Sequence, residues 1–203
     1  GEAHSVTVGA RKLVDILRAL PDDAEVTLQQ QEKRLLVRAG KSRFALQTLP
    51  AEDFPRLAKP GGDSARFALP QKALRRLLGL VQYAMAQQDI RYYLNGLLMV
   101  VEDKALKLIA TDGHRLAYAA MALDGKLTRQ EVIVPRKSVI ELGKLLADSD
   151  EEVNVEISAT QACFAFGGVE LVSKLVDGKF PDYTRVIPVG HKNSLSISRE
   201  ALR

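Results

Sequence analysis

Four consecutive residues with side chains suited to catalysis or ligand binding interrupt one of the most apolar stretches of the chain. The sequence ATDGHRLA, residues 110–117, places Asp112, Gly113, His114 and Arg115 next to one another. A carboxylate beside an imidazole is a pair that general acid–base catalysis uses, and an arginine can hold an anionic group. Catalysis also needs a third partner, and adjacent residues do not automatically point their side chains together.

The surrounding residues favour a turn over an active site. LKLIATDGHRLAYAAM, residues 106–121, consists of an apolar strand, Asp-Gly as turn residues and a second strand. The other histidines, His4 and His191, lie at the start of the chain and in a predicted linker, and the sequence has no GxSxG, Walker-type, HExxH or paired-cysteine motif. A hydrolase centred on Asp112 and His114 is kept as an alternative hypothesis.

Composition indicates an ordinary soluble protein. The 203 residues are 46% hydrophobic and 27% charged, enough for a substantial core or for more than one compact unit. Apolar runs such as LLMVV, 97–101, are far shorter than the roughly 18 residues of a membrane span, and no signal-peptide pattern opens the chain, so we expect a cytoplasmic location. The single Cys163 lies in the alternating run ACFAFG, which is typical of a buried thiol. We expect no metal and no cofactor.

The elements that must position the turn recur along the chain. A short alternating strand runs directly into a helical pattern at Val6, Phe67, Val132 and Leu195, at intervals of 61, 65 and 63 residues. After the first and third helices the hydrophobic period changes to two, with short polar or glycine-containing turns between segments. Each unit is therefore predicted to be β-α-β-β-β.

The units alternate in type. Phe54-Pro55 and Phe180-Pro181 each lie 48 residues after the strand start of the first and third units, whereas the second unit carries ATDGHRLA instead. The natural pair is therefore the second unit with the third. RLAKPGGDSA, residues 56–65, has the composition of an interdomain linker.

Basic residues gather on the predicted helices, on the side away from the apolar stripe. They are Arg11, Arg18, Lys72, Arg75, Arg76, Arg136, Lys137 and Lys144. For a single helix, a solvated surface explains such charges. Their recurrence in equivalent helices, including first turns where cations oppose the helix dipole, favours a basic surface that follows a phosphate backbone without reading bases.

Two irregular stretches add candidate binding residues. In QQDIRYYLNG, residues 87–96, polar and aromatic groups are combined in Gln88, Arg91, Tyr92 and Tyr93, although tyrosines packed on their own domain are the alternative. KFPDYTRVIP, residues 179–188, carries apolar and basic groups on irregular backbone, as a peptide-binding pocket requires.

Four motifs in order, RYYLNG, ATDGHRLA, VIVPRK and SKLVDGKFPDYTRV, resemble the bacterial DNA polymerase III β subunit, the family of replicative sliding clamps. The resemblance implies an α+β DNA clamp fold, in which repeated β-α-β-β-β units place helices on the inner face and antiparallel sheets outside. It also implies that two chains close head to tail into a homodimeric ring around double-stranded DNA.

The resemblance also implies a domain organisation. Residues 1–62 correspond to the second half of the first clamp domain, 66–190 to the complete middle domain, and 192–203 to the start of the third. The chain is then a fragment that lacks about half of one domain and most of another. Ring closure is accordingly an expectation for the full-length protein.

Site residues follow from the matching motifs. One wall of the family's peptide-binding pocket corresponds here to Leu94, Thr111, Gly113, His114, Arg115, Leu116, Pro181, Arg185 and Val186. The DNA contacts correspond to Gln88, Tyr92, Tyr93, Arg136 and Lys137. The dimer edge corresponds to the strand KSRFAL, residues 41–46, with Phe44 and Leu46.

The function expected from the resemblance is a non-catalytic processivity subunit of a DNA-directed DNA polymerase holoenzyme. The ring tethers the polymerase catalytic subunit to duplex DNA, and the pocket docks that subunit, the clamp loader and repair polymerases through short peptides. A DNA-binding repeat protein that forms no ring is the second alternative, beside the hydrolase.

Overall fold

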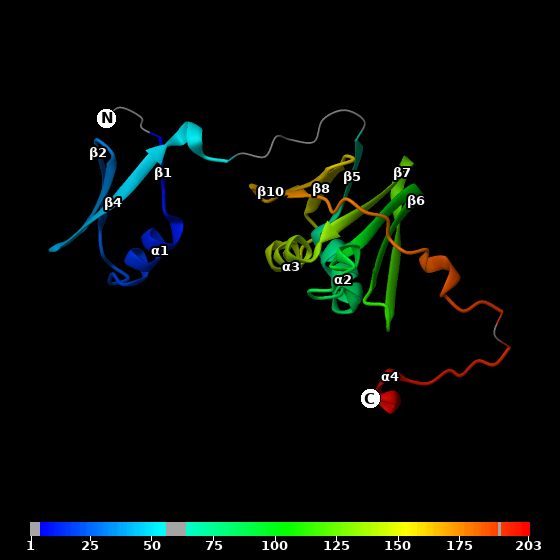
Figure 1. Ribbon diagram of the computed structural model, residues 1–203. Helices are drawn as coiled ribbons and strands as arrows, with labels where there is room; N and C mark the ends of the chain where they lie inside the picture. Colours follow the sequence, from blue (N-terminus) through cyan, green and yellow to red (C-terminus); the bar gives the residue numbers. More distant parts are fainter. Residues whose placement is uncertain (1–4, 56–63, 191) are drawn as a thin grey trace. The chain divides into compact units, whose positions relative to one another are not determined.

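The structure is a computed structural model that describes residues 5–55, 64–190 and 192–203. The chain divides into two compact units, Gly1–Leu57 and Ala58–Arg203, which we call the N-terminal and C-terminal units (Figure 1). Most of the predicted linker, together with His4 and His191, lies outside the described residues.

The N-terminal unit has the predicted β-α-β-β-β order. Its elements are β1 (Val6–Val8), α1 (Ala10–Arg18), β2 (Val26–Gln31), β3 (Arg34–Ala39), β4 (Ser42–Pro50) and the short 3-10 helix η1 (Ala51–Asp53). The strands form an antiparallel sheet in the order β1-β4-β3-β2. Gly40, at the turn between β3 and β4, has a φ of 52°, a conformation that glycine adopts without strain.

The C-terminal unit contains the other repeats. Its elements are β5 (Ala65–Pro70), α2 (Gln71–Val81), η2 (Gln82–Ala84), η3 (Tyr92–Leu94), β6 (Gly96–Thr111), β7 (Leu116–Pro135), α3 (Arg136–Leu145), β8 (Glu152–Ile157), β9 (Gln161–Phe166), β10 (Val169–Lys174), η4 (Tyr183–Arg185) and α4 (Arg199–Leu202). One antiparallel sheet has the order β10-β9-β8-β5, and β6 pairs with β7 in another. Helices and antiparallel sheets together make an α+β fold.

In the second repeat, the predicted short strands are joined into the long strands β6 and β7. The segment predicted to begin a new strand at Val132 is the last part of the long β7, which pairs with the first part of β6. The pairing shifts register on both sides of Asp103, whose φ is 48°. The pairing of β6 with β7 is therefore irregular at this point and regular on both sides of it.

The β6–β7 hairpin separates two apolar clusters, because successive side chains of a strand point to opposite faces. On one face, Leu106, Leu108 and Ala117 pack in the main core with buried residues of α2 and α3. The opposite face, which we call the outer face, carries a smaller cluster. Its buried members are Ala86, Leu94, Leu98, Val100, Ile109, Ile133 and Phe180.

The segments that follow α2 and α3 each cap the start of the other helix. Each helix follows a proline, and neither has a side-chain N-cap. The backbone N–H of Gln71 instead donates to the carbonyl of Glu151, after α3, at 2.9 Å. The N–H of Arg136 donates to the carbonyl of Asn95, after α2, at 3.0 Å. This exchange supplies partners for amides that a helix leaves unsatisfied, and it fixes the loop that ends at Asn95.

The predicted strand at Leu195 is not formed in the described residues. Residues 195–197 pair with no described strand, and Leu195 is largely exposed. The helix that follows does begin, at Arg199, with the Ser198 hydroxyl accepting from the N–H of Ala201 at 3.2 Å. Helix capping is local, whereas a strand needs a neighbour.

Candidate functional site

The connection between β6 and β7 is a tight turn, as predicted. Oδ1 of Asp112 accepts hydrogen bonds from the backbone N–H groups of His114 and Arg115, both at 3.0 Å. Gly113 has a φ of 89°, which favours glycine. The hydroxyl of Thr111 donates to the carbonyl of Arg115 at 2.7 Å and closes the turn.

These bonds assign Asp112 a structural role. The N–H of His114, then that of Arg115, hold the pKa of Asp112 below its ordinary value. Oδ1 of Asp112 thus serves the backbone of its own turn, and Oδ2 lies 3.0 Å from Nε of Arg115. A carboxylate stabilised as an anion by its own turn is a weak proton acceptor.

Arg91 supports the turn from the loop that precedes η3. Its guanidinium donates to both carboxylate oxygens of Asp89, at 3.0 and 2.8 Å, and to the carbonyl of Asp112 at 3.2 Å. Hydrogen bonding from Arg91 lowers the pKa of Asp89 to about 2. A Cβ atom on Gly113 would lie 3.0 Å from this guanidinium, so the small residue permits the contact. The sequence indicated Arg91 as one of the polar groups of this loop but not as a support of the turn, although the Asp-x-Arg spacing was a usable signal for its pairing with Asp89.

A groove of about 420 Å³ lies beside the turn, and we call it the turn groove. Its lining residues are Arg91, Tyr93, Leu94, Thr111, Gly113, His114, Arg115, Leu116, Phe180, Pro181, Asp182, Tyr183 and Val186. All residues predicted for a peptide pocket line it except Arg185. The guanidinium of Arg185 instead pairs with Asp182 at 2.9 Å, and its side chain is 83% exposed.

A second hollow, of about 470 Å³, lies on the other side of the turn. Arg115 is fixed toward it, since Nη2 donates to the carbonyl of Tyr83 at 2.7 Å and the guanidinium lies 5.5 Å from the centre of the Tyr83 ring. His114 and Arg115 line both hollows, so the turn is a shared wall.

The residues predicted to contact DNA are divided between these surfaces. Gln88 and Arg136 line the second hollow together, and the Arg136 guanidinium donates to the carbonyl of Met85 at 3.2 Å. Tyr92 is 58% exposed and meets the Tyr93 ring edge to face at 5.7 Å. Tyr93 packs on the outer-face cluster and lines the turn groove, as the alternative interpretation of this loop expects. Lys137 is exposed at the start of α3.

Local acidic residues pair with part of the basic helix surface. Lys72 lies 2.6 Å from Asp150, and Lys144 lies 3.0 Å from Glu141. The acidic stretch after α3 thus lies beside the N-terminal end of α2, which the sequence did not indicate. Arg75 and Arg76 are exposed on α2.

The predicted dimer edge lies on β4 of the N-terminal unit. Phe44 is half-buried and pairs in register with Val37, and Leu46 is buried. Within the described residues, Ser42–Gln47 pairs with β3 on one side and with no strand on the other. The backbone there is an open strand edge.

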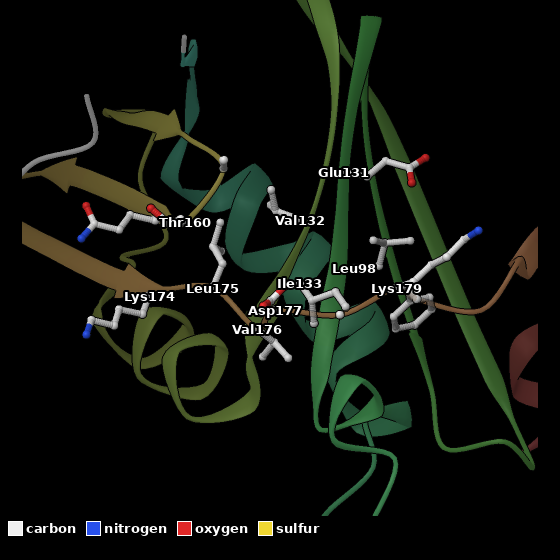
Figure 2. Close-up of a pocket in the computed structure, with 14 residues that line it drawn as sticks. Leu98, Glu131, Val132, Ile133, Thr160, Lys174, Leu175, Val176, Asp177 and Lys179 are labelled. Atoms are coloured by element: carbon white, nitrogen blue, oxygen red, sulfur yellow. The ribbon is translucent and has the colours of Figure 1, made fainter. Parts of the chain in front are cut away.

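A hollow of about 670 Å³ lies between β7 and the segment after β10 and contains no predicted site residue (Figure 2). Thr160 and Lys174 stand on one side of it, and Glu131 and Lys179 on the other. Ile133 and Val176 bridge the two sides, with the N–H of Val176 donating to the carbonyl of Ile133 at 2.9 Å.

The described residues contain neither a metal-binding cluster nor a membrane-spanning helix. No group of three or more histidine, cysteine, aspartate or glutamate side chains in that part of the chain is placed to hold a metal ion. No helix there is long and apolar enough to cross a membrane.

Family models match both units. The model described as the DNA polymerase III beta subunit, central domain, matches residues 68–182, and the model for the N-terminal domain matches residues 1–58. The beta sliding clamp of Pseudomonas aeruginosa is 46% identical over 205 residues, and that of Escherichia coli K12 is 45% identical over 202 residues. Each alignment covers 100% of this chain and 55% of the relative, so the chain spans about half the length of these relatives.

Solved structures agree with these matches. A crystal structure of the Pseudomonas aeruginosa DNA polymerase III subunit beta has a TM-score of 0.82 and 48% identity, covering 91% of this chain and 51% of that one. A clamp from the same organism bound to griselimycin has a TM-score of 0.84 and 47% identity, covering 92% and 51%. The turn, the groove and the repeated fold therefore belong to a chain that is a member of the DNA polymerase III beta subunit family, the beta sliding clamps.

Proposed function

We propose that the chain is part of a sliding clamp that encircles double-stranded DNA and tethers a replicative polymerase. Membership of the clamp family supports this, as does the repeated fold with basic helices. Residues 1–62 supply half of the first domain, 66–190 the middle domain and 192–203 the start of the third. A ring holds DNA by topology, so weak, sequence-independent contacts suffice.

The turn groove is the proposed docking site for partner peptides, and it is the observation that carries this part of the function. Its apolar side chains Leu94, Leu116 and Val186 suit side-chain anchors, while the turn offers polar backbone at the rim. The proposed ligands are short segments of the polymerase catalytic subunit, the clamp loader and repair polymerases. Griselimycin, bound by the Pseudomonas clamp, is proposed to occupy this groove too.

The proposed DNA contacts are Gln88, Tyr92, Tyr93, Arg136 and Lys137. The shared hollow of Gln88 and Arg136 supports two of these, and the exposure of Tyr92 and Lys137 supports two more. Tyr93 is the weakest member because it packs against its own unit. The open edge at Phe44 and Leu46 is the proposed junction with a second chain of a homodimeric ring.

We propose a processivity role without catalysis, in the cytoplasm. The rival hydrolase needs Asp112 as a base or orienting group for His114, yet the backbone of the turn occupies that carboxylate. Loss of a phosphoesterase turnover on His114→Ala would support the rival instead.

The decisive experiment uses the full-length clamp that carries this sequence. A clamp loaded on closed circular DNA is expected to stay bound and to slide off once the circle is cut, as measured by gel filtration of the labelled protein with DNA. Equal retention on linear and circular DNA would favour the DNA-binding protein that forms no ring.

Variants of the same protein separate its two surfaces. Leu116→Ala is expected to weaken griselimycin binding about tenfold by removing apolar contact, with DNA association unchanged. Arg136→Ala combined with Lys137→Ala is expected to weaken DNA association at low salt, with griselimycin binding unchanged. Unchanged affinities in either case would remove those residues from their proposed site.

A further inference from the structure

The outer face of the β6–β7 hairpin carries charged side chains as well as the apolar cluster. Because side chains of a strand alternate between its two faces, Ile109 lies on this face together with Tyr118, which pairs with it in register. Lys107, two residues before Ile109, lies on this face too. Glu102, two residues after Val100 and four after Leu98, also lies on this face. Phe180 packs in the apolar cluster, and the charged side chains pair with one another.

The charged side chains form a connected ion-pair network. Glu102 pairs with Lys107 on its own strand and with Arg129 of β7, the latter at 2.8 Å. Arg129 also pairs with Glu131. The Glu102 and Lys107 side chains are only 22% and 25% exposed, so water screens this pair less than a fully exposed one. The network has two cations and two anions and is therefore neutral, with its side chains held in place.

Tyr183 of η4 packs on this face of the hairpin. Its ring lies 6.1 Å from the Tyr118 ring, centre to centre, with an interplanar angle of 31°. Lys107 pairs with Ala120, two residues from Tyr118, so Lys107 and Tyr118 are diagonal neighbours on this face. Burial raises the pKa of Tyr183, and the positive charge of Lys107 opposes this rise. Tyr183 also packs on the apolar cluster.

The position of Tyr183 matters because η4 forms one wall of the turn groove. Pro181 and Asp182 precede Tyr183, and Val186 follows the helix; all of these line the groove. Inside the segment the bonds are local: the Asp182 carboxylate accepts from the N–H of Thr184 and pairs with the guanidinium of Arg185. Local bonds shape η4 but do not attach it to the hairpin. Tyr183 attaches η4 to the hairpin, through its contact with Tyr118 and its packing on the apolar cluster.

We propose that Tyr118 and the Glu102–Lys107–Arg129 network are positioning residues for peptide docking: they form a platform that holds the η4 wall in its binding geometry. This inference rests on the proposed function of the turn groove and adds residues that do not line it. A wall that is ordered before binding saves the ligand the entropic cost of ordering it, so losing the platform weakens binding without removing any contact.

The test uses griselimycin as the probe and the full-length clamp carrying this sequence. Tyr118→Ala is expected to raise the Kd, measured by surface plasmon resonance, about five- to tenfold, and Tyr118→Phe to restore it to within about twofold. Lys107→Met is expected to raise the Kd about two- to threefold. Lys104→Met, at an exposed position of the same strand, is the matched control and should leave the Kd unchanged.

A second readout reports the wall directly. Hydrogen exchange of the amides at residues 182–187 is expected to become about fivefold faster or more in Tyr118→Ala without ligand, with the exchange of α2 unchanged. Global unfolding would accelerate both segments, so it would not imitate this pattern.

Two groove variants separate the failure of this inference from failure of the groove itself. Leu116→Ala and Val186→Ala remove groove contacts. If they weaken binding while Tyr118→Ala changes neither Kd nor exchange, the positioning role is overturned and the groove stands. If they also leave the Kd unchanged, the groove is not the docking site and both proposals fall.

Discussion

Helices α1 and α2 occupy the same place in equivalent repeats, yet they differ in burial. Leu13 and Leu74 both stand seven positions after the strand start; Leu74 is fully buried, whereas Leu13 is half-buried. Among the described residues, α1 has no buried side chain, and Val14 and Leu17 are each 42% exposed. A single β-α-β-β-β unit therefore does not bury its own apolar stripe, since that requires a second layer.

The helix starts show the same difference. Ala10, Gln71 and Arg136 are the first residues of α1, α2 and α3 and stand at equivalent repeat positions. The Gln71 amide accepts from the N–H of Ala147 at 3.1 Å, and Arg136 donates to Met85. In each case the partner belongs to the segment after the other helix. Ala10, at the start of α1, has no side chain able to make such a bond.

The largest expected effect tests this comparison directly. Leu74→Ala should lower the free energy of unfolding of the C-terminal unit by about 3 kcal/mol, because it opens a cavity at a fully buried site. The equivalent Leu13→Ala should leave that transition unchanged. All tyrosines of the chain lie in the C-terminal unit, so urea unfolding followed by tyrosine fluorescence measures this unit alone. Similar losses for both variants would mean that the units unfold together.

The next effect concerns the turn that only the second repeat carries. Gly113→Ala should cost about 2 kcal/mol by the same measurement, from backbone strain at φ 89° plus the close Cβ contact with Arg91. Gly125→Ala is the matched control, with φ 85° and open space around the added Cβ, and should cost about 1 kcal/mol. Equal costs would show that Arg91 moves aside freely.

A smaller effect tests the exchange of partners between helices. Gln71→Ala should cost about 1 kcal/mol, because it leaves the N–H of Ala147 without its acceptor. Tyrosine-detected urea unfolding again measures the loss. Gln71→Glu retains an acceptor oxygen and should recover part of the lost stability. If Gln71→Ala is as stable as the unaltered chain, water has replaced the bond.

The smallest effect is a pH dependence confined to the C-terminal unit. The pKa of Asp89 is lowered from 3.8 to about 2, chiefly by hydrogen bonds from Arg91. A lowered carboxylate pKa stabilises the fold fully above about pH 4, and this stabilisation is lost as the pH falls toward 2. Asp89→Asn should therefore be less stable than the unaltered chain at pH 6, with the difference shrinking as the pH falls through about 2. A constant difference in thermal midpoint across this range would contradict the assignment.

Local chemistry explains why much of the site was predictable. The Asp-Gly turn needs only residues that are adjacent in sequence, so its hairpin followed from ATDGHRLA, and the repeated strand–helix pattern indicated the α+β architecture. The groove residues came from the family resemblance, and Arg185 is placed outside the lining because Asp182, three residues earlier, holds its guanidinium.

Contacts between distant segments were not predictable in this way. Arg91 meets Gly113, and Tyr183 meets Tyr118, across separations that no periodicity encodes. The predicted short strands are likewise joined into β6 and β7 across the irregular register near Asp103, which depends on the pairing of distant segments.

The sequence by itself determined the repeat, the turn at Gly113 and the chemical character of the groove residues, because periodicity and turn chemistry act over a few neighbouring positions. Only the tertiary structure decided which repeats are fully packed, that Asp112 serves its own turn, and which side chains hold the groove wall. Burial and hydrogen bonding depend on what lies across space from a residue, and two nearly equivalent helices can therefore carry the same pattern with different outcomes.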